Sequence, residues 1–210
     1  MARKSKKQTA ETREALIDAA TALFMQHGMA RVSLDAIAAK AGVTRGAFYC
    51  HFKNKLDLIY ALYHEIYSHY TTMLKTDLIA NDQRHALEQL EKLCIKLSLD
   101  LAANKRHQRI LTVFYLRCDY ADELEPLLEL EAKSMQDDIA MFSSYFQRAI
   151  DQGLLPADTN VQHHALATQS FLNGMCYQGL RFPEVISFAQ TAPTLINLFF
   201  DRYRAHTIAA

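Results

Sequence analysis

The chain has 210 residues, half of them hydrophobic and 22% charged, with only 6 Gly and 4 Pro. This composition excludes a disordered, collagen-like or linker-dominated chain and provides enough apolar material for one or two folded domains. No apolar run approaches the roughly 20 residues that a membrane-spanning helix needs. The basic start is followed by polar residues rather than by the apolar segment of a secretion signal. We therefore expect a cytoplasmic protein with no membrane contact.

The 23 basic and 23 acidic side chains cancel over the whole chain, but they are distributed unevenly. Residues 1–55 hold ten Lys or Arg and four Asp or Glu, which gives +6. The remaining 13 basic and 19 acidic side chains give residues 56–210 a balance of −6. A small cationic head on a larger anionic body is the charge layout of a protein whose first part meets phosphate.

Apolar residues recur at helical spacing along almost the entire chain, and Gly, Pro or polar clusters interrupt them. Gly28 and Gly42 are typical helix ends, while Ser33 and Thr44 are typical helix starts. No alternating Val, Ile and Thr run indicates a strand, so the predicted fold is all-α with about nine helices. Helices are expected over residues 10–27, 34–41, 45–51, 55–79, 84–102, 105–118, 122–152, 159–180 and 192–206.

The second and third of these helices, joined by a turn at Gly42, predict a helix-turn-helix. On a helical wheel Phe48 points toward the core, away from a face that can enter a DNA major groove. Arg45 can reach guanine edges or phosphate, and Lys55 at the next helix start can clamp a second phosphate. The alternative is an αα-hairpin whose charges are only solvated. The groove-facing residues are Arg45, Gly46, Tyr49 and Cys50.

Residues 41–55, with the sequence AGVTRGAFYCHFKNK, resemble the signature of TetR-type repressors. The basic start with Glu11-Thr12-Arg13 is similar to the AcrR, TtgR and MtrR branch of that family, which controls multidrug efflux pumps. Residues 117–120 (RCDY) and 155–158 (LPAD) are similar to further elements of the same branch. The resemblance therefore extends beyond the helix-turn-helix.

This resemblance implies a DNA-binding domain at residues 1–55 and an effector-binding and dimerisation domain at residues 56–210. The implied protein is a homodimeric repressor that leaves a palindromic operator when a small hydrophobic or cationic aromatic effector binds. Cys50 stands where the family usually has Trp or another aromatic residue, so we expect a different operator preference. A second hypothesis is that oxidation of the Cys50 thiol weakens DNA binding. The predicted DNA-binding residues are Ser33, Thr44, Arg45, Gly46, Tyr49, Cys50, His51 and Lys55.

The predicted helix over residues 55–79 carries a row of tyrosines at intervals of about one turn. Such a row is most often part of a core. Its second half is also suited to an apolar or cationic aromatic effector, because tyrosine stacks, forms hydrogen bonds and attracts cations through its ring. The candidate effector-binding residues, chosen by composition and helical phase, are Tyr67, Tyr70, Met73, Phe114, Cys118, Met141, Phe171 and Met175.

The last predicted helix is apolar over most of its circumference, which a solvated terminal helix does not tolerate. We expect one side of it to pack on its own chain and the other side on a second subunit. A homodimer is also what a helix-turn-helix needs to bind two half-sites.

Signals of catalytic or metal chemistry are weak. His64 and His69 are five residues apart, so their imidazoles lie about 140° apart on a helix and cannot share a metal as an HExxH pair does. The four cysteines form no CxxC pair, and no P-loop, GxGxxG or GxSxG occurs. We expect no enzyme, no metal and no cofactor. Two alternatives stay open: a TetR-type repressor of metabolic genes with an effector such as a fatty-acid derivative, and a helical adaptor or enzyme that does not bind DNA.

Overall fold

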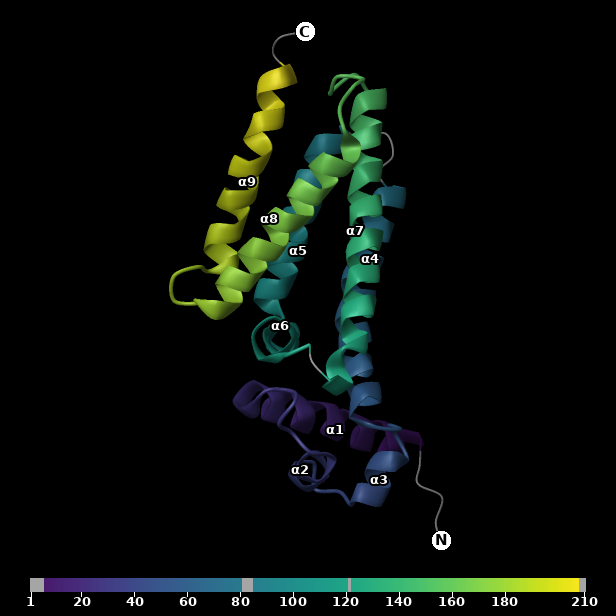
Figure 1. Cartoon of the computed structure of the whole chain (residues 1–210). Coiled ribbons are helices and arrows are strands. Elements are labelled where there is room, and N and C mark those ends of the chain that lie inside the picture. The colour runs from purple at the N-terminus through teal and green to yellow at the C-terminus, as the bar shows by residue number, and fades with distance from the viewer. Residues whose placement is uncertain (1–5, 81–84, 121, 208–210) are drawn as a thin grey trace. The chain divides into compact units, whose positions relative to one another are not determined.

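The structure, a computed structural model, describes residues 6–80, 85–120 and 122–207. Within these residues the chain forms nine α-helices, one short 3-10 helix and no strand, which confirms the all-α prediction (Figure 1). The elements are α1 (Lys6–His27), α2 (Leu34–Lys40), α3 (Arg45–Tyr49), α4 (Lys55–Ala80), α5 (Ala86–Ala103), α6 (Lys105–Arg117), η1 (Asp122–Leu124), α7 (Pro126–Asp151), α8 (Val161–Arg181) and α9 (Phe188–Thr207).

Side-chain caps and a glycine turn set the limits of the two short helices. The Ser33 hydroxyl accepts a hydrogen bond from the Ala36 N–H at 3.2 Å and so begins α2. The Thr44 hydroxyl accepts from the Ala47 N–H at 3.1 Å and begins α3 in the same way. Between them Gly42 has a φ of 69°, a conformation that favours glycine. Ser33, Thr44 and Gly42 therefore begin and end helices at the positions that the sequence predicts.

Three predicted helix starts differ from the structure by four residues, and the first is α1, which begins at Lys6 and not at residue 10. The helix expected to begin at residue 122 begins at Pro126, because a 3-10 turn precedes it and proline suits a first helical position. The last helix begins at Phe188, ahead of the expected residue 192, and includes Pro193. Proline there removes one backbone donor and its ring crowds the Ala189 carbonyl, a cost that the packing of α9 on α5 offsets.

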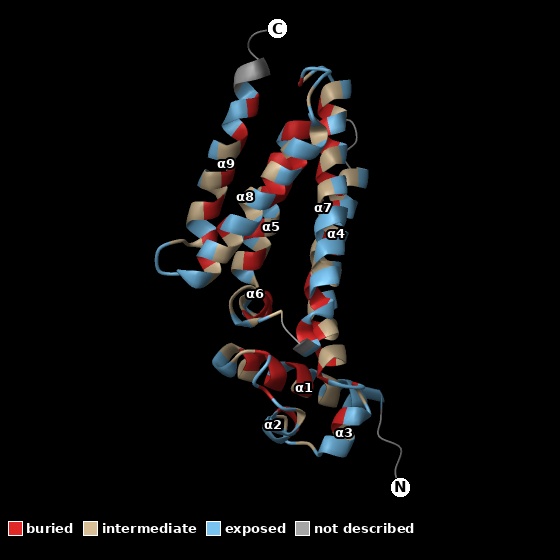
Figure 2. Cartoon of the chain, viewed as in Figure 1, coloured by how far each residue is buried: buried red, intermediate tan, exposed pale blue. Residues whose placement is uncertain are grey.

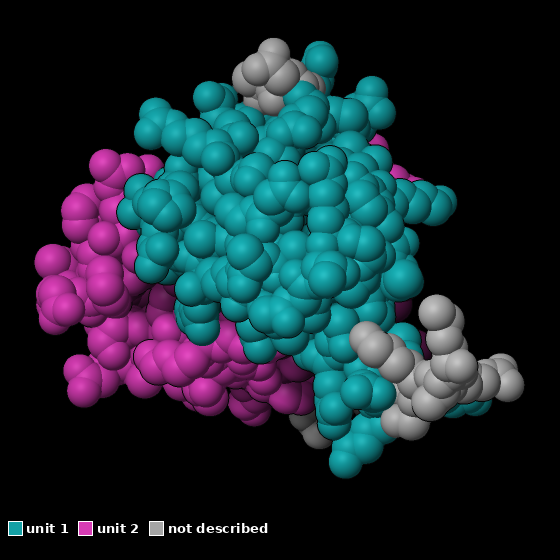
Figure 3. Space-filling model, turned by 90° about the horizontal axis from the view of Figure 1, so that it is seen from below, with its two compact units in different colours: residues 1–66, 109–129 teal, residues 67–108, 130–210 magenta. Residues whose placement is uncertain are grey.

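The chain divides into two compact units (Figure 3). The first contains residues 1–66 and 109–129, and the second contains residues 67–108 and 130–210. Helix α4 passes from the first unit into the second after Ile66, and α6 passes from the second into the first after Gln108. The predicted limit of the DNA-binding part at residue 55 therefore falls inside a larger compact unit, and that limit stays a prediction.

Each unit has its own apolar core, coloured red in Figure 2. In the first unit, Phe24 of α1, Ile37 of α2 and Phe48 of α3 have no exposed surface. In the second unit, α9 packs on α5, and its residues Ile196 and Phe200 are buried. No described helix has both the length and the apolar character needed to cross a membrane.

Candidate DNA-binding and effector sites

The helix-turn-helix is formed by α2 and α3, which contact each other, and α2 also contacts α1. Ile37 and Ala38 of α2 are buried, and Phe48 is the buried residue of α3. The opposite surface of α3 is open to solvent, and Tyr49 is 49% exposed there. The structure places the predicted residues Ser33, Thr44, Arg45, Gly46, Tyr49 and Cys50 in exposed positions and His51 in a half-buried one.

The Arg45 side chain is held at this surface by two polar neighbours. Its guanidinium donates to the Asp35 carboxylate of α2 at 3.1 Å and to the Tyr49 hydroxyl at 3.3 Å. The Tyr49 hydrogen bond and then the Asp35 charge raise the pKa of Arg45, which keeps it cationic. Because both partners are exposed, this ion pair is weak, and a phosphate or a guanine edge can replace Asp35.

The glycine at position 46 is not required by the protein's own packing. A Cβ built on Gly46 meets only the Thr44 hydroxyl, at an ordinary 3.8 Å, and its φ is not positive. A missing side chain at an exposed position of α3 leaves room for a partner outside the chain. One turn later the exposed Cys50 thiol donates to the Gly46 carbonyl at 3.5 Å.

Lys55 is the one predicted DNA-binding residue that the structure buries. Its ammonium is buried and donates to the carbonyls of Met29, Ala30 and Val32 at 3.2, 3.3 and 3.2 Å. It also forms an ion pair with Glu123. An ammonium that shares its three protons among these acceptors is not presented to a phosphate. The geometry therefore supports a structural role, in which Lys55 fixes the segment that precedes α2.

The eight candidate effector residues do not belong to one compact unit. Phe114 and Cys118 lie in the first unit, where Phe114 is buried and packs edge-on against Tyr63 with ring centroids 5.5 Å apart. Phe171 is stacked on Phe199 with centroids 4.5 Å apart. The candidates in the second unit are the half-buried Tyr67, Tyr70, Met73 and Phe171 and the buried Met141 and Met175.

Tyr70 has the most unusual surroundings among these residues. Its hydroxyl is buried and has no hydrogen-bond partner among the described residues. Burial raises the pKa of Tyr70, and the nearby Asp100 and Cys176 add to this effect. Burial also raises the pKa of the Cys176 thiol to about 12, so both groups stay neutral. A buried hydroxyl without a partner is the kind of group that a bound ligand or water satisfies.

A pair of carboxylates lies beside Tyr67. The Tyr67 hydroxyl donates to the Asp137 carboxylate at 2.9 Å. Burial, and then the charge of Asp137, raises the pKa of Asp138 to about 6. At neutral pH this part of the second unit therefore joins an aromatic ring to negative charge, which suits a cationic aromatic molecule.

Two models of known protein families match this chain. Residues 16–62 match the model of bacterial regulatory proteins of the tetR family, and residues 85–205 match the C-terminal region of MAATS-type transcriptional repressors. The chain belongs to the TetR family. The match to the first model covers the helix-turn-helix, and the match to the second covers most of α5 to α9.

Individual TetR-family relatives match along nearly their whole length. The chain is 31% identical to the HTH-type transcriptional repressor BepR of Brucella suis, with 93% of this chain and 95% of BepR covered. NalD, the secondary repressor of the MexAB-OprM multidrug efflux pump of Pseudomonas aeruginosa, has a structure with a TM-score of 0.79, 28% identity and coverage of 93% and 97%. A complex of SmeT, the repressor of a Stenotrophomonas maltophilia multidrug efflux pump, with triclosan has a TM-score of 0.76, 28% identity and coverage of 92% and 90%.

A groove of about 540 Å³ lies between α5 and α9 of this TetR-family chain. None of the candidate effector residues lines it. Its wall includes the ion pair of Glu91 with Arg204, at 2.5 Å. The lining residues are His85, Leu87, Glu88, Glu91, Lys92, Ile95, Asn197, Phe200, Tyr203 and Arg204.

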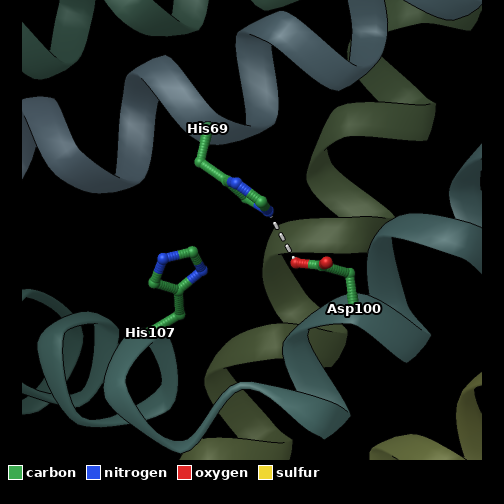
Figure 4. A group of neighbouring side chains, drawn as sticks. All are labelled: His69, Asp100 and His107. Carbon is green, nitrogen blue, oxygen red and sulfur yellow. Dashed lines mark hydrogen bonds and ion pairs between the residues drawn. The ribbon is translucent and has the colours of Figure 1, made fainter.

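The sequence reasoning missed a cluster formed by His69, Asp100 and His107 (Figure 4). The spacing of His64 and His69 excludes a metal shared by these two, but the neighbours of His69 come from other helices. No motif joins three residues that are far apart in sequence. Only the packing of α4 against the corner between α5 and α6 brings them together.

Proposed function

We propose that this protein is a dimeric, ligand-responsive repressor of a multidrug efflux pump operon. The observation that carries the proposal is the likeness to NalD and SmeT, which extends over the helix-turn-helix and over the C-terminal region. Both relatives are repressors of multidrug efflux pumps. A repressor of this kind acts on the chromosome, in the cytoplasm.

On the DNA side, we assign α3 to the major groove. Arg45 exchanges its exposed partner Asp35 for a guanine edge or a phosphate, while Tyr49 contacts phosphate or a thymine methyl. Gly46 allows close approach of the backbone. Ser33, Thr44, Cys50 and His51 complete the proposed contact surface, and Lys55 supports it from inside.

On the effector side, we assign a cationic aromatic compound to the part of the second unit around Tyr67 and Tyr70. Tyr70 offers a buried hydroxyl with no partner among the described residues, and Tyr67 lies beside Asp137 and Asp138. The excess of acidic over basic side chains in residues 56–210 also favours a cationic effector. Effector binding then shifts the population of conformations toward one that no longer fits the operator.

The proposed dimer uses the outer faces of α8 and α9. Leu166 and Leu198 are 39% and 62% exposed, whereas Ile196 and Phe200 on another side of α9 are buried within the chain. Exposed leucines on two helices that are otherwise packed suit a self-complementary helical interface. Two heads then contact two half-sites.

The test is binding of the purified protein to the DNA upstream of its own gene, over a salt series, with the Arg45→Ala variant beside it. We expect a steep fall of affinity with salt. Arg45→Ala should lower discrimination between operator and scrambled DNA by about 1–3 kcal/mol. Lys96→Ala is the control, since it removes an exposed charge from α5. Equal discrimination by both variants would contradict the assignment of α3.

Release is tested with a panel of cationic aromatic dyes and anionic dyes of similar size. We expect the cationic members to displace the protein from its operator and the anionic members to leave it bound. Displacement by acyl-chain compounds alone would favour the metabolic repressor instead.

A further inference from the structure

The cluster of His69, Asp100 and His107 joins three helices of the second unit. His69 belongs to α4, Asp100 to α5 and His107 to α6, and all three side chains point toward one spot (Figure 4). The His69 Nε2 lies 2.8 Å from the Asp100 Oδ2, and the two imidazole centroids are 4.6 Å apart. One ligand atom from each residue lies within 4.8 Å of the other two.

Hydrogen bonds in the corner between α5 and α6 hold two members of this cluster in place. Asn104 ends α5, and its side-chain oxygen accepts from the His107 N–H at 3.1 Å. The Gln108 amide donates to two carbonyls at the end of α5, at 2.8 and 2.9 Å. These bonds fix the backbone of the corner that carries Asp100 and His107.

The surroundings of the cluster combine a closed side with an open one. His107 is buried, and the Tyr70 ring packs against it and against His69, with centroids 5.8 and 5.0 Å apart. The side chains of His69 and Asp100 are 35% and 31% exposed. An ion can thus reach the ligand atoms from solvent, while the aromatic wall restricts the movement of the imidazoles.

We propose that His69, Asp100 and His107 bind one divalent transition-metal ion, with Zn²⁺ as the ion of best fit. Two imidazoles and one carboxylate form a common ligand set for Zn²⁺, whereas Mg²⁺ and Ca²⁺ prefer oxygen ligands alone. Ligands about 2.0–2.2 Å from a tetrahedral ion lie about 3.3–3.6 Å from one another. The present separations, 2.8 Å between His69 Nε2 and Asp100 Oδ2 and at most 4.8 Å among the three ligand atoms, lie on either side of that range.

The total charge of these three ligands also suits a cation. Two neutral imidazoles and one carboxylate place a single negative charge beside two neutral donors, and three protein ligands leave a fourth position for water or another ligand. A simple His69–Asp100 ion pair does not require the third side chain. The convergence of His107 from another helix is the observation that favours a metal ion.

A bound ion would cross-link α4 to α6. His69 lies just after the point where α4 enters the second unit, and His107 lies just before the point where α6 leaves it. The ion would therefore tie together the two helices that continue into the unit with the helix-turn-helix. Binding of the ion can be measured without operator and without effector.

The test uses full-length protein without a purification tag, stripped of metal with a chelator and titrated calorimetrically with ZnCl₂ alone. We expect one ion per chain and a rise in melting temperature with Zn²⁺. His69→Gln and Asp100→Asn, which keep the side-chain size, should weaken binding at least tenfold and abolish that rise. His64→Gln is the matched control, because His64 is an exposed histidine of the same helix. It should behave as wild type.

Absence of Zn²⁺ binding by the wild-type protein would overturn the proposal. Equal Zn²⁺ affinity of His69→Gln, Asp100→Asn and the His64→Gln control would overturn it too. Titration with Co²⁺ supplies a second measurement that does not depend on the stability of a variant. The visible bands of a cobalt ion with nitrogen and oxygen ligands are expected in the wild-type protein. An intense thiolate-to-cobalt band in the near ultraviolet would assign the ion to cysteines and refute the site.

Discussion

The Lys55→Met substitution tests whether Lys55 is a structural cation. Methionine keeps an apolar stem and removes the ammonium that the carbonyls of Met29, Ala30 and Val32 share. Met29 and Val32 are buried, and a buried acceptor without a donor costs about 1–3 kcal/mol. Glu123 is exposed, so water solvates it at little cost. We expect the free energy of unfolding to fall by about 2–4 kcal/mol.

The assay is urea unfolding followed by circular dichroism, at one fixed protein concentration because the stability of a dimer depends on it. Lys53→Met is the control, since Lys53 is exposed in the same segment. Its free energy of unfolding should change by less than about 0.5 kcal/mol. Operator affinity of both variants is measured in parallel over a salt series.

A Lys55→Met protein as stable as the Lys53→Met control would refute the structural role. If it also showed a salt dependence reduced by roughly one phosphate contact per chain, Lys55 would belong to the DNA interface, as the motif suggested. A less stable variant whose folded fraction keeps the wild-type salt dependence agrees with the buried position of the ammonium.

Three further substitutions test the second unit. Tyr70→Phe removes a buried hydroxyl that has no partner among the described residues, so it should leave the free energy of unfolding unchanged or raise it by up to about 1 kcal/mol. Tyr67→Phe, in contrast, loses a hydrogen bond, and equal losses in urea unfolding would contradict this reasoning. The pKa of Asp138 is raised from 3.8 to about 6 in the folded state, so the stability that its protonated form provides is present below pH 3.8 and lost as the pH rises through about 6. The free energy of unfolding of Asp138→Asn should therefore exceed that of wild type by up to about 3 kcal/mol at pH 7.5 but by little near pH 4, and a gain independent of pH would refute the cause. Leu198→Glu should shift the protein to a monomer in analytical ultracentrifugation and weaken operator binding, while Ile79→Glu, at a still more exposed position of α4, should change neither.

The features that the sequence predicted well depend on neighbours along the chain. Ser33 and Thr44 cap helices by bonding N–H groups three residues later, and Gly42 alone permits the φ of the turn. The exposed face of α3 follows from helical periodicity once Phe48 is assigned to the core. Such signals are local, so one sequence is enough to find them.

The features that the sequence did not predict depend on contacts between distant segments. The burial of Lys55 needs Glu123, and the metal-site proposal needs His107 beside His69. Residue type and helical phase are the only signals behind the effector candidates. Neither signal shows that Phe114 and Tyr70 belong to different compact units. Helical phase predicts which side of one helix a residue lies on. Which other helix packs against that side is known only from the tertiary structure.

The first compact unit has a consequence for how the protein matures on the ribosome. Residues 109–129 complete this unit: the Met29 N–H donates to the Arg117 carbonyl at 2.9 Å, and Glu123 pairs with Lys55. A nascent chain that has emerged only to Ile66 lacks both partners. At about 5–20 residues per second, synthesis of the missing stretch takes several seconds more. The unit that contains the helix-turn-helix therefore cannot be completed until the ribosome has passed residue 129.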